Sequence, residues 1–278
     1  PMEPRPIGLV VNPRSGNDVR RVIASAGSST LEDKTSIVRR VVLGARAAGA
    51  TRFITHHEPH RIVGRATETL RGVTVEKVGE PIDNTEDDTT RAVAIMRERG
   101  CAVVVVLGGD GTNRAAAKAW PDMPVIPLST GTNNAFPYWV EPTVAGSAAG
   151  LVATGEVPAD DSVLRPAKVV RVLMPDGGEE LALIDAVAVA DPWVGSLELF
   201  EPATMRTAVL TRADPAAIGF SAVGGLLVPC GPDDERGVVV QFADPDADPP
   251  VRLVAPTAPG HYAAIGIREC RSLHLGAA

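Results

Sequence analysis

The amino-acid sequence predicts an α/β domain with a mostly parallel sheet, followed by a β-rich domain. In the first half, short apolar runs alternate with helical patterns, and strands spaced by helices form parallel sheets because parallel neighbours need a crossover connection. The run CAVVVVL, residues 101–107, is apolar throughout, as expected of a strand buried on both faces. After about residue 160 the pattern changes to strands separated by turns.

The first domain is expected to contain five strands and five helices in alternation. The expected strands are residues 7–11, 52–55, 73–78, 101–107 and 123–128. The expected helices are residues 34–48, 61–71, 86–99, 113–120 and 141–156. At the helix of residues 86–99, Asp87 or Asp88 is the expected N-terminal cap and Gly100 the expected stop. The last helix has proline in its first turn and many small residues, which predicts close packing.

The stretch VPADD, residues 157–161, is predicted to link the two domains. This places an α/β domain at residues 1–156 and a β-rich domain at residues 157–278. Helices on both faces of the first sheet would give that domain a three-layer, Rossmann-like architecture. In the second domain, AKVVRVLM and EELALIDAVAVA are predicted to form a hairpin through the connection PDGG, residues 175–178.

Composition and charge narrow the classes of function. Hydrophobic residues make up 45% and charged residues 22% of the 278 residues, which is typical of soluble globular proteins. The formal net charge of −7 argues against nucleic-acid binding and against docking on anionic lipid. The sequence shows no membrane-spanning stretch and no signal peptide, and its three cysteines have no metal or redox spacing. We therefore expect a cytoplasmic protein without nucleic-acid or membrane partners.

The turn GGDGT, residues 108–112, follows the buried strand and precedes an alanine-rich helix. In a parallel sheet, ligands bind outside the carboxyl ends of the strands. Gly108, Gly109 and Gly111 can adopt positive φ and leave space for backbone N–H groups to approach a ligand. The helix expected to begin near Thr112 or Asn113 adds the positive end of its dipole, which favours phosphate oxygens.

Asp110 is the only charged residue in this turn. A carboxylate beside phosphates is repelled unless a cation or a transferable proton lies between them, so Asp110 predicts a Mg²⁺ ligand or a base acting on a substrate hydroxyl. These features indicate nucleotide phosphates, a metal and phosphoryl transfer. The alternative is a plain strand-to-helix turn in which Asp110 caps the helix, although turns seldom need three glycines around an acid.

Two more polar turns follow strands of the same predicted sheet. NPRSG, residues 12–16, closes the first strand, and PLSTGTNNAFP, residues 127–137, includes the end of the strand that follows GGDGT. Asn133 and Asn134 can both donate and accept hydrogen bonds, which suits ribose hydroxyls and an adenine edge. Each of the two segments could also be a simple connecting loop.

Two other features have competing interpretations. HHEPH, residues 56–60, could hold a metal, but a polar loop is favoured because the adjacent His56 and His57 point in different directions in most backbone geometries. Arg114 lies in the first turn of the helix after GGDGT and could approach phosphate, or it could be a solvated helix residue.

The order NPRSG, LGGDGTNR and PLSTGTNN, before a β-rich second half, resembles the superfamily of NAD kinases and diacylglycerol or sphingosine kinases. Within it, the segments DDTTRAV, GGDGTNRAAAKAW, PLSTGTNNAFP and EPTVAGSAAGLVATGE are most similar to the acetoin catabolism protein X (AcoX) branch. The clear match covers about residues 7–156 and is weak over the second half.

This resemblance implies an N-terminal α/β domain, a C-terminal β-sandwich-like domain, and ATP and Mg²⁺ bound between them. Asp110 would be the metal ligand or base. The positions that would bind nucleotide and phosphates are Asn12, Ser15, Gly16, Gly108, Gly109, Gly111, Thr112, Arg114, Thr130, Gly131, Thr132, Asn133 and Asn134.

The sequence departs from the superfamily pattern at two places. NAD kinases carry an asparagine-acid pair in the second domain, whereas here Ile184 precedes Asp185. Asp185 is therefore a second catalytic candidate, with a solvent-facing acid at a strand edge as the alternative. Lipid kinases have Asn-Asp in the turn where this chain has Asn133-Asn134. The first difference weakens the case for NAD as acceptor, and the second weakens the case for a lipid.

The expected function is an ATP- and Mg²⁺-dependent kinase that phosphorylates a hydroxyl of a small soluble molecule, with NAD or a related nucleotide as the first acceptor to test. A non-catalytic ATP- or NAD-binding sensor or accessory protein is one alternative, and a lipid kinase is another. The sequence leaves open whether the chain forms a homo-oligomer.

Overall fold

The computed structural model describes residues 3–15, 29–80, 82–130, 134–190 and 201–276. These residues form two compact units. The first unit contains the described residues up to Pro166, and the second contains those from Ala167 onward. Each unit has buried apolar clusters of its own, two in the first and one in the second.

The first unit is built on a five-stranded parallel sheet with the strand order β3-β2-β1-β4-β5. Its strands are β1 (Ile7–Val11), β2 (Arg52–His56), β3 (Thr74–Val78), β4 (Val103–Leu107) and β5 (Val125–Leu128). The predicted parallel sheet is confirmed, and each strand lies within a few residues of its expected range.

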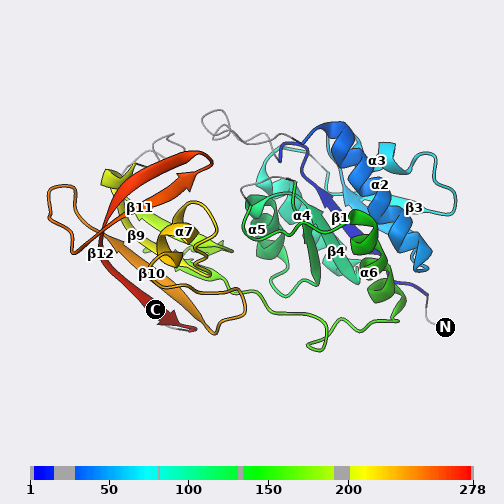
Figure 1. Ribbon diagram of the computed structural model, residues 1–278. Coiled ribbons are helices and arrows are strands. Elements are labelled where there is room, and N and C mark those ends of the chain that lie inside the picture. Colours follow the sequence, from blue (N-terminus) through cyan, green and yellow to red (C-terminus); the bar gives the residue numbers. More distant parts are fainter. Residues whose placement is uncertain (1–2, 16–28, 81, 131–133, 191–200, 277–278) are drawn as a thin grey trace. The chain divides into compact units, whose positions relative to one another are not determined.

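Helices cover both faces of this sheet (Figure 1). One layer consists of α2 (Leu31–Ala47), α3 (Ile62–Thr67) and α6 (Pro142–Thr154), and the other of α4 (Glu86–Glu98) and α5 (Asp110–Ala119). Alternate residues of β4 pack into the two layers, Val103 and Val105 into the first and Val104 and Val106 into the second. The predicted three-layer architecture is therefore confirmed. In the described part of the chain, no helix combines the length and apolarity needed to cross a bilayer.

The N-terminal cap of α4 differs from the expectation. Thr85 is the cap, and its hydroxyl accepts a hydrogen bond from the backbone N–H of Asp87 at 3.3 Å. Asp88 lies in the first turn of the helix, where its carboxylate accepts hydrogen bonds from two backbone N–H groups of the preceding loop. The prediction of Asp87 or Asp88 was wrong because a cap residue needs extended backbone, which Thr85 has. Gly100 follows the helix with a φ of 71°, as expected of a helix stop.

Glycines let α2 and α6 approach each other at backbone distance. A Cβ added to Gly44 would lie 2.1 Å from the carbonyl oxygen of Thr143, and one added to Gly146 would lie 2.0 Å from that of Val41. Neither site can accept a methyl group unless the helices separate. The close packing predicted for the helix near residues 141–156 is confirmed, and it fixes α2 firmly against its neighbour.

The second unit is β-rich, as predicted. Its main sheet is antiparallel with the strand order β11-β12-β10-β9-β8. The strands are β8 (Asp185–Val189), β9 (Met205–Leu210), β10 (Arg236–Phe242), β11 (Val251–Ala258) and β12 (His261–His274). The short helix α7 (Phe220–Gly225) follows a 3₁₀ turn (Pro202–Thr204) and β9 in the chain, and contributes to the core of this sheet.

The predicted hairpin around PDGG is confirmed only in part. β6 (Val170–Leu173) pairs with β7 (Glu179–Ala182), but the rest of the expected partner strand leaves the hairpin and becomes β8. Thr211 binds the chain where it changes sheet, since its backbone N–H and hydroxyl donate to the carbonyl groups of Ile184 and Leu183 at 2.8 Å each.

We predict that Gly146→Ala destabilises the protein by about 3 kcal/mol, because the added methyl group meets backbone of α2 and overpacking of this kind is costly. The intrinsic helix preference for alanine works in the opposite direction by about 1 kcal/mol. Denaturant unfolding measures the difference.

Gly64→Ala in α3 is the matched control. Its added Cβ would have no neighbour nearer than 3.9 Å, so stability should stay equal or rise. Equal losses of stability for the two variants would contradict the close packing of α2 and α6.

Candidate functional site

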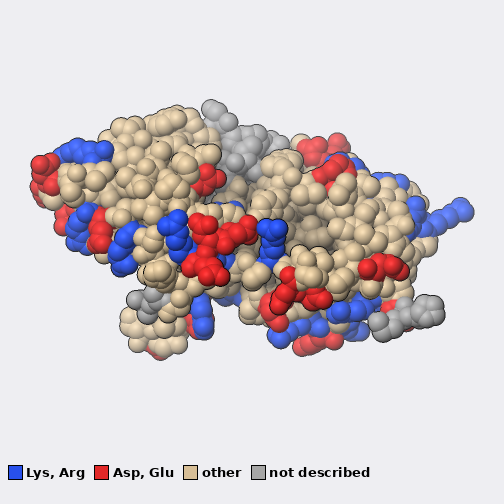
Figure 2. All heavy atoms as spheres, turned by 60° about the horizontal axis from the view of Figure 1, so that its bottom comes forward, with Lys and Arg blue, Asp and Glu red and all other residues tan. Residues whose placement is uncertain are grey.

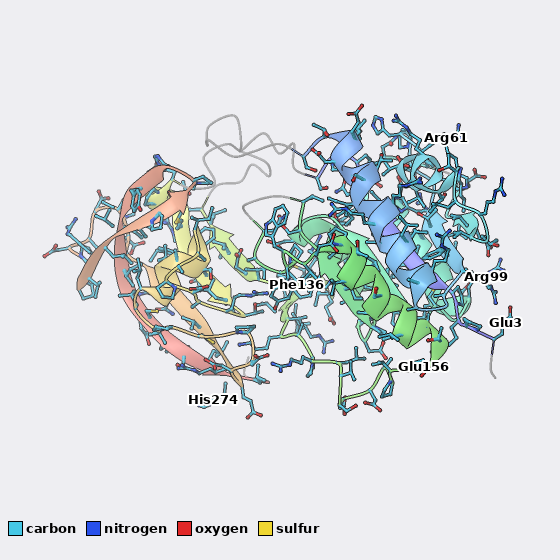
Figure 3. All side chains as sticks on the ribbon, turned by 45° about the vertical axis from the view of Figure 1, so that its right-hand side comes forward. Glu3, Arg61, Arg99, Phe136, Glu156 and His274 are labelled. Carbon is cyan, nitrogen blue, oxygen red and sulfur yellow. The ribbon has the colours of Figure 1, made fainter. Side chains whose placement is uncertain are left out.

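Three turns meet at the carboxyl edge of the parallel sheet, one after each of the neighbouring strands β1, β4 and β5. The described residues of these turns are 12–15 (the β1 turn), 108–112 (the β4 turn, which includes the first residues of α5), and 129–130 with 134–138 (the β5 turn). In Figure 3, Phe136 of the β5 turn lies at one end of the first unit, whereas Glu3, Arg99 and Glu156 lie at the opposite end.

The β4 turn enters its helix earlier than expected. Gly109 is the N-cap of α5 and Asp110 its first residue, because the backbone N–H of Asn113 already donates to the carbonyl oxygen of Gly109 at 3.1 Å. The predicted start near Thr112 or Asn113 was therefore two or three residues late. Glycine is a poor helix former, but the first turn has few intrahelical hydrogen bonds to lose, so this penalty has little weight there.

The three glycines of the β4 turn do not use the positive φ that glycine permits. Their absent side chains matter for packing instead. A Cβ at Gly108 would lie 2.6 Å from the hydroxyl oxygen of Thr112, and one at Gly109 would lie 2.7 Å from Oδ1 of Asn134. Of the three, Gly111 alone has no atom of the described residues within 4 Å of its added Cβ. Two of the glycines therefore make room for the protein's own side chains, and one leaves space beside the helix N-terminus.

The carboxylate of Asp110 connects the β4 turn with the β5 turn. Oδ1 accepts hydrogen bonds from the backbone N–H groups of Phe136 at 2.8 Å and Ala135 at 3.1 Å, and Oδ2 accepts from Ala135 at 3.1 Å. The half-buried Asp110 does not cap its own helix, since the cap residue is Gly109. Instead it acts as an acceptor for the backbone of the neighbouring turn.

The β1 turn is bound to both of the other turns. Nδ2 of Asn12 donates to the hydroxyl of Thr112 at 2.9 Å, and the hydroxyl of Thr130 donates to that of Ser15 at 2.8 Å. Within the β5 turn, Asn134 donates to the hydroxyl of Ser129 at 3.4 Å. The predicted residues Asn12, Ser15, Thr112, Thr130 and Asn134 thus lie in one hydrogen-bonded group with Asp110.

Other predicted residues lie elsewhere or outside the described chain. The guanidinium of Arg114 pairs with Glu86 of α4 at 2.9 Å. Asp185 is the first residue of β8 in the second unit. Gly16, Gly131, Thr132 and Asn133 lie outside the described residues.

Sequence reasoning missed Lys34, although its ammonium contacts the β1 turn. The side chain is 1% exposed, and Nζ donates to the carbonyl oxygens of Pro13 at 2.6 Å and Ser15 at 2.7 Å. A lysine early in a helix usually points to solvent, so its residue type gives no signal. The signal that was available is the capping box formed by Thr30 and Asp33, which marks the start of α2 just before Lys34.

The HHEPH segment does not form a metal cluster. Across the part of the chain that the structure describes, no group of three or more histidine, cysteine, aspartate or glutamate residues could hold a metal ion. The expectation of a polar loop was wrong for His56, which is the last residue of β2 and is 7% exposed. Burial lowers the pKa of its imidazole to about 4, although the charge of Asp88 acts in the other direction. At neutral pH His56 is therefore uncharged.

Comparison with known proteins identifies both halves of the chain. Residues 7–157 match the model of the ATP-NAD kinase N-terminal domain, and residues 168–278 match that of the acetoin catabolism protein X C-terminal domain. Acetoin catabolism protein X of Cupriavidus necator is 35% identical over 282 aligned residues, which cover 97% of this chain and 78% of the relative. The chain belongs to the acetoin catabolism protein X family. These matches confirm the predicted resemblance. The β1, β4 and β5 turns all lie within the residues that match the kinase domain.

We predict that Gly109→Ala destabilises the protein by about 1–3 kcal/mol, because its Cβ would displace the side chain of Asn134. Gly111→Ala in the same turn should leave the free energy of unfolding unchanged or slightly raised, since its Cβ meets no atom within 4 Å in the part of the chain that the structure describes. Thermal or urea unfolding of the pair gives the comparison. A loss of stability in Gly111→Ala alone would contradict this assignment of the two glycines.

We also predict that His56 makes stability fall as the pH drops from about 6.5 to about 4. The folded imidazole stays neutral down to about pH 4, whereas the unfolded one gains its proton near 6.5, so acid favours the unfolded chain over this window. The contribution lost is about 3 kcal/mol. His56→Gln should flatten the pH dependence of urea unfolding by that amount, and His60→Gln, at an exposed position, should not.

Proposed function

We propose that this protein is an ATP- and Mg²⁺-dependent phosphotransferase that phosphorylates a hydroxyl group of a small soluble molecule in the cytoplasm. The observation that supports this most directly is the convergence of the three turns on the N-terminus of α5, next to the open side of Gly111. The first N–H groups of a helix have no intrahelical acceptor and, with the helix dipole, favour phosphate oxygens. The kinase-like domain that contains these turns is consistent with this chemistry.

The acceptor atoms of Asp110 fit a Mg²⁺ ion that arrives with the nucleotide. Oδ1 already accepts two hydrogen bonds and Oδ2 accepts one, so Oδ2 retains one lone pair. Mg²⁺ in nucleotide sites is commonly bound by one or two carboxylates, phosphate oxygens and water. Asp110 would hold this ion, which would neutralise phosphate charge during transfer.

The chain's own residues would position the reactants. Backbone N–H groups at the start of α5 would bind phosphate oxygens near Gly111, and Asn134 would orient the nucleoside. Asn12 and Ser15 would hold the β1 turn against the phosphate region through Thr112 and Thr130. Phosphoryl transfer depends mainly on such positioning and on charge neutralisation. We include Gly16, Gly131, Thr132 and Asn133 in this nucleotide site on sequence grounds.

The molecule that accepts the phosphoryl group is proposed as a chemical class, a small soluble molecule with a hydroxyl group. NAD or a related nucleotide remains the first acceptor to test, with Asp185 as its catalytic candidate in the second unit. The name of the relative refers to acetoin catabolism, so short hydroxyketones and diols belong in the same panel. On the face shown in Figure 2, acidic and basic side chains are interspersed.

A non-catalytic nucleotide sensor is the second candidate function. Ile184 stands directly before Asp185, where NAD kinases carry an asparagine, and its side chain is only 7% exposed. A buried apolar side chain cannot bind an acceptor hydroxyl. Calorimetry with ATP, ADP and NAD, combined with a turnover assay, distinguishes the two functions, because a sensor binds nucleotide without consuming it.

We predict that Asp110→Asn lowers ATP turnover by about 100-fold or more, because it removes the carboxylate proposed to hold Mg²⁺, and loss of one group that stabilises charge in the transition state costs a factor of this order. The amide replaces one acceptor oxygen by a donor that faces backbone N–H groups, so both the charge and the hold on the β5 turn are weakened. Turnover is measured with NAD, diacylglycerol, hydroxyketones and diols as acceptors.

Asp122→Asn makes the same change of charge at an exposed position after α5 and should retain full activity. Gly111→Ala should keep its stability but raise the KM for ATP. Equal turnover by Asp110→Asn and the unmodified protein would defeat the role proposed for Asp110.

A further inference from the structure

Lys34 is among the most buried side chains of the first unit despite its charge. It is the fourth residue of α2 and is 1% exposed. Its ammonium donates to the carbonyl oxygens of Pro13 and Ser15 at 2.6 and 2.7 Å, and both acceptors belong to the β1 turn. A buried ammonium is costly unless its donors are satisfied. The β1 turn in its present shape therefore supplies two of the acceptors that this buried ammonium needs.

The position of Lys34 is itself fixed by the scaffold. The start of α2 is held by reciprocal hydrogen bonds between Thr30 and Asp33, at 2.9 and 3.1 Å. Farther along, α2 contacts α6 through Gly44 and Gly146 at backbone distance. The lysine thus projects from a rigid support toward a turn that has irregular structure.

The β1 turn passes this constraint to the other two turns. Asn12 donates to Thr112 of the β4 turn, and Ser15 accepts from Thr130 of the β5 turn. The two carbonyl groups that Lys34 binds belong to Pro13, directly after Asn12, and to Ser15 itself. A displacement of this turn would therefore disturb both inter-turn hydrogen bonds at once.

We propose that Lys34 is a positioning residue of the nucleotide site: its ammonium fixes the β1 turn on α2 and so sets the placement of Asn12 and Ser15 against the β4 and β5 turns. This inference rests on the proposed function, since it assumes that the three turns together bind ATP. Lys34 acts through the turn and makes no contact with substrate.

The test compares Lys34→Met, which keeps the apolar stem but removes the donors, with two controls. Val42→Ala, in the core face of the same helix, lowers stability without touching the β1 turn, and Lys77→Met removes an exposed lysine from β3. Each variant is studied well below its unfolding temperature. Calorimetry measures ATP binding, turnover gives KM and kcat, and hydrogen exchange measures the protection of the Ser15 amide, which donates to Asn12.

Lys34→Met should weaken ATP binding by about 10-fold to 100-fold, as small misplacements in a site commonly do, and should speed exchange of the Ser15 amide. Both controls should bind ATP like the unmodified protein. If Lys34→Met does not fold, Lys34→Arg provides the test, because it keeps a cation and several donors on a larger head group and should show an intermediate loss.

Unchanged ATP binding and unchanged exchange at Ser15 in Lys34→Met would overturn the inference, and so would an equal loss of binding in Val42→Ala. Failure of the unmodified protein to bind ATP would instead refute the proposed function. In that case, exchange at Ser15 would still show whether Lys34 holds the β1 turn.

Discussion

The carboxylate of Asp110 accepts hydrogen bonds from the backbone N–H groups of Ala135 and Phe136, and the geometry of the site depends on this contact. It joins the first turn of α5 to a turn that would otherwise have to satisfy those N–H groups elsewhere. Charge-assisted hydrogen bonds of this kind are stronger than neutral ones. Because Oδ1 already accepts two hydrogen bonds and Oδ2 accepts one, a cation would bind at the remaining lone pair of Oδ2, which restricts where a nucleotide phosphate could lie.

The other two contacts of the site extend this arrangement across the sheet. Asn12 binds Thr112, and Ser15 binds Thr130, so hydrogen bonds connect the turn after β1 with the turns after β4 and β5. The strand order places these three strands side by side, with β4 in the middle. Parallel pairing aligns their carboxyl ends, which is why residues about a hundred positions apart can share hydrogen bonds.

The glycines of the GGDGT turn were expected to make space for a ligand, but two of them make space for side chains of the protein itself. At Gly108 and Gly109 the missing side chains make space for Thr112 and Asn134, so they serve the internal contacts of the site. At Gly44 and Gly146 the same property brings two helices together. A glycine in a sequence shows only that a side chain is absent, whereas the neighbour that occupies the space is known only from the fold.

The sequence by itself determined the alternation of strands and helices, the parallel sheet and the three polar turns at one edge, because hydrophobic periodicity and turn residues are local signals. It also indicated Asp110, Asn12 and Ser15 as members of one site. Only the tertiary structure decided what Asp110 binds, that Arg114 pairs with Glu86, and that Lys34 is buried beneath the β1 turn. These outcomes depend on partners distant in sequence, and no local pattern records which carbonyl or N–H group a side chain will meet.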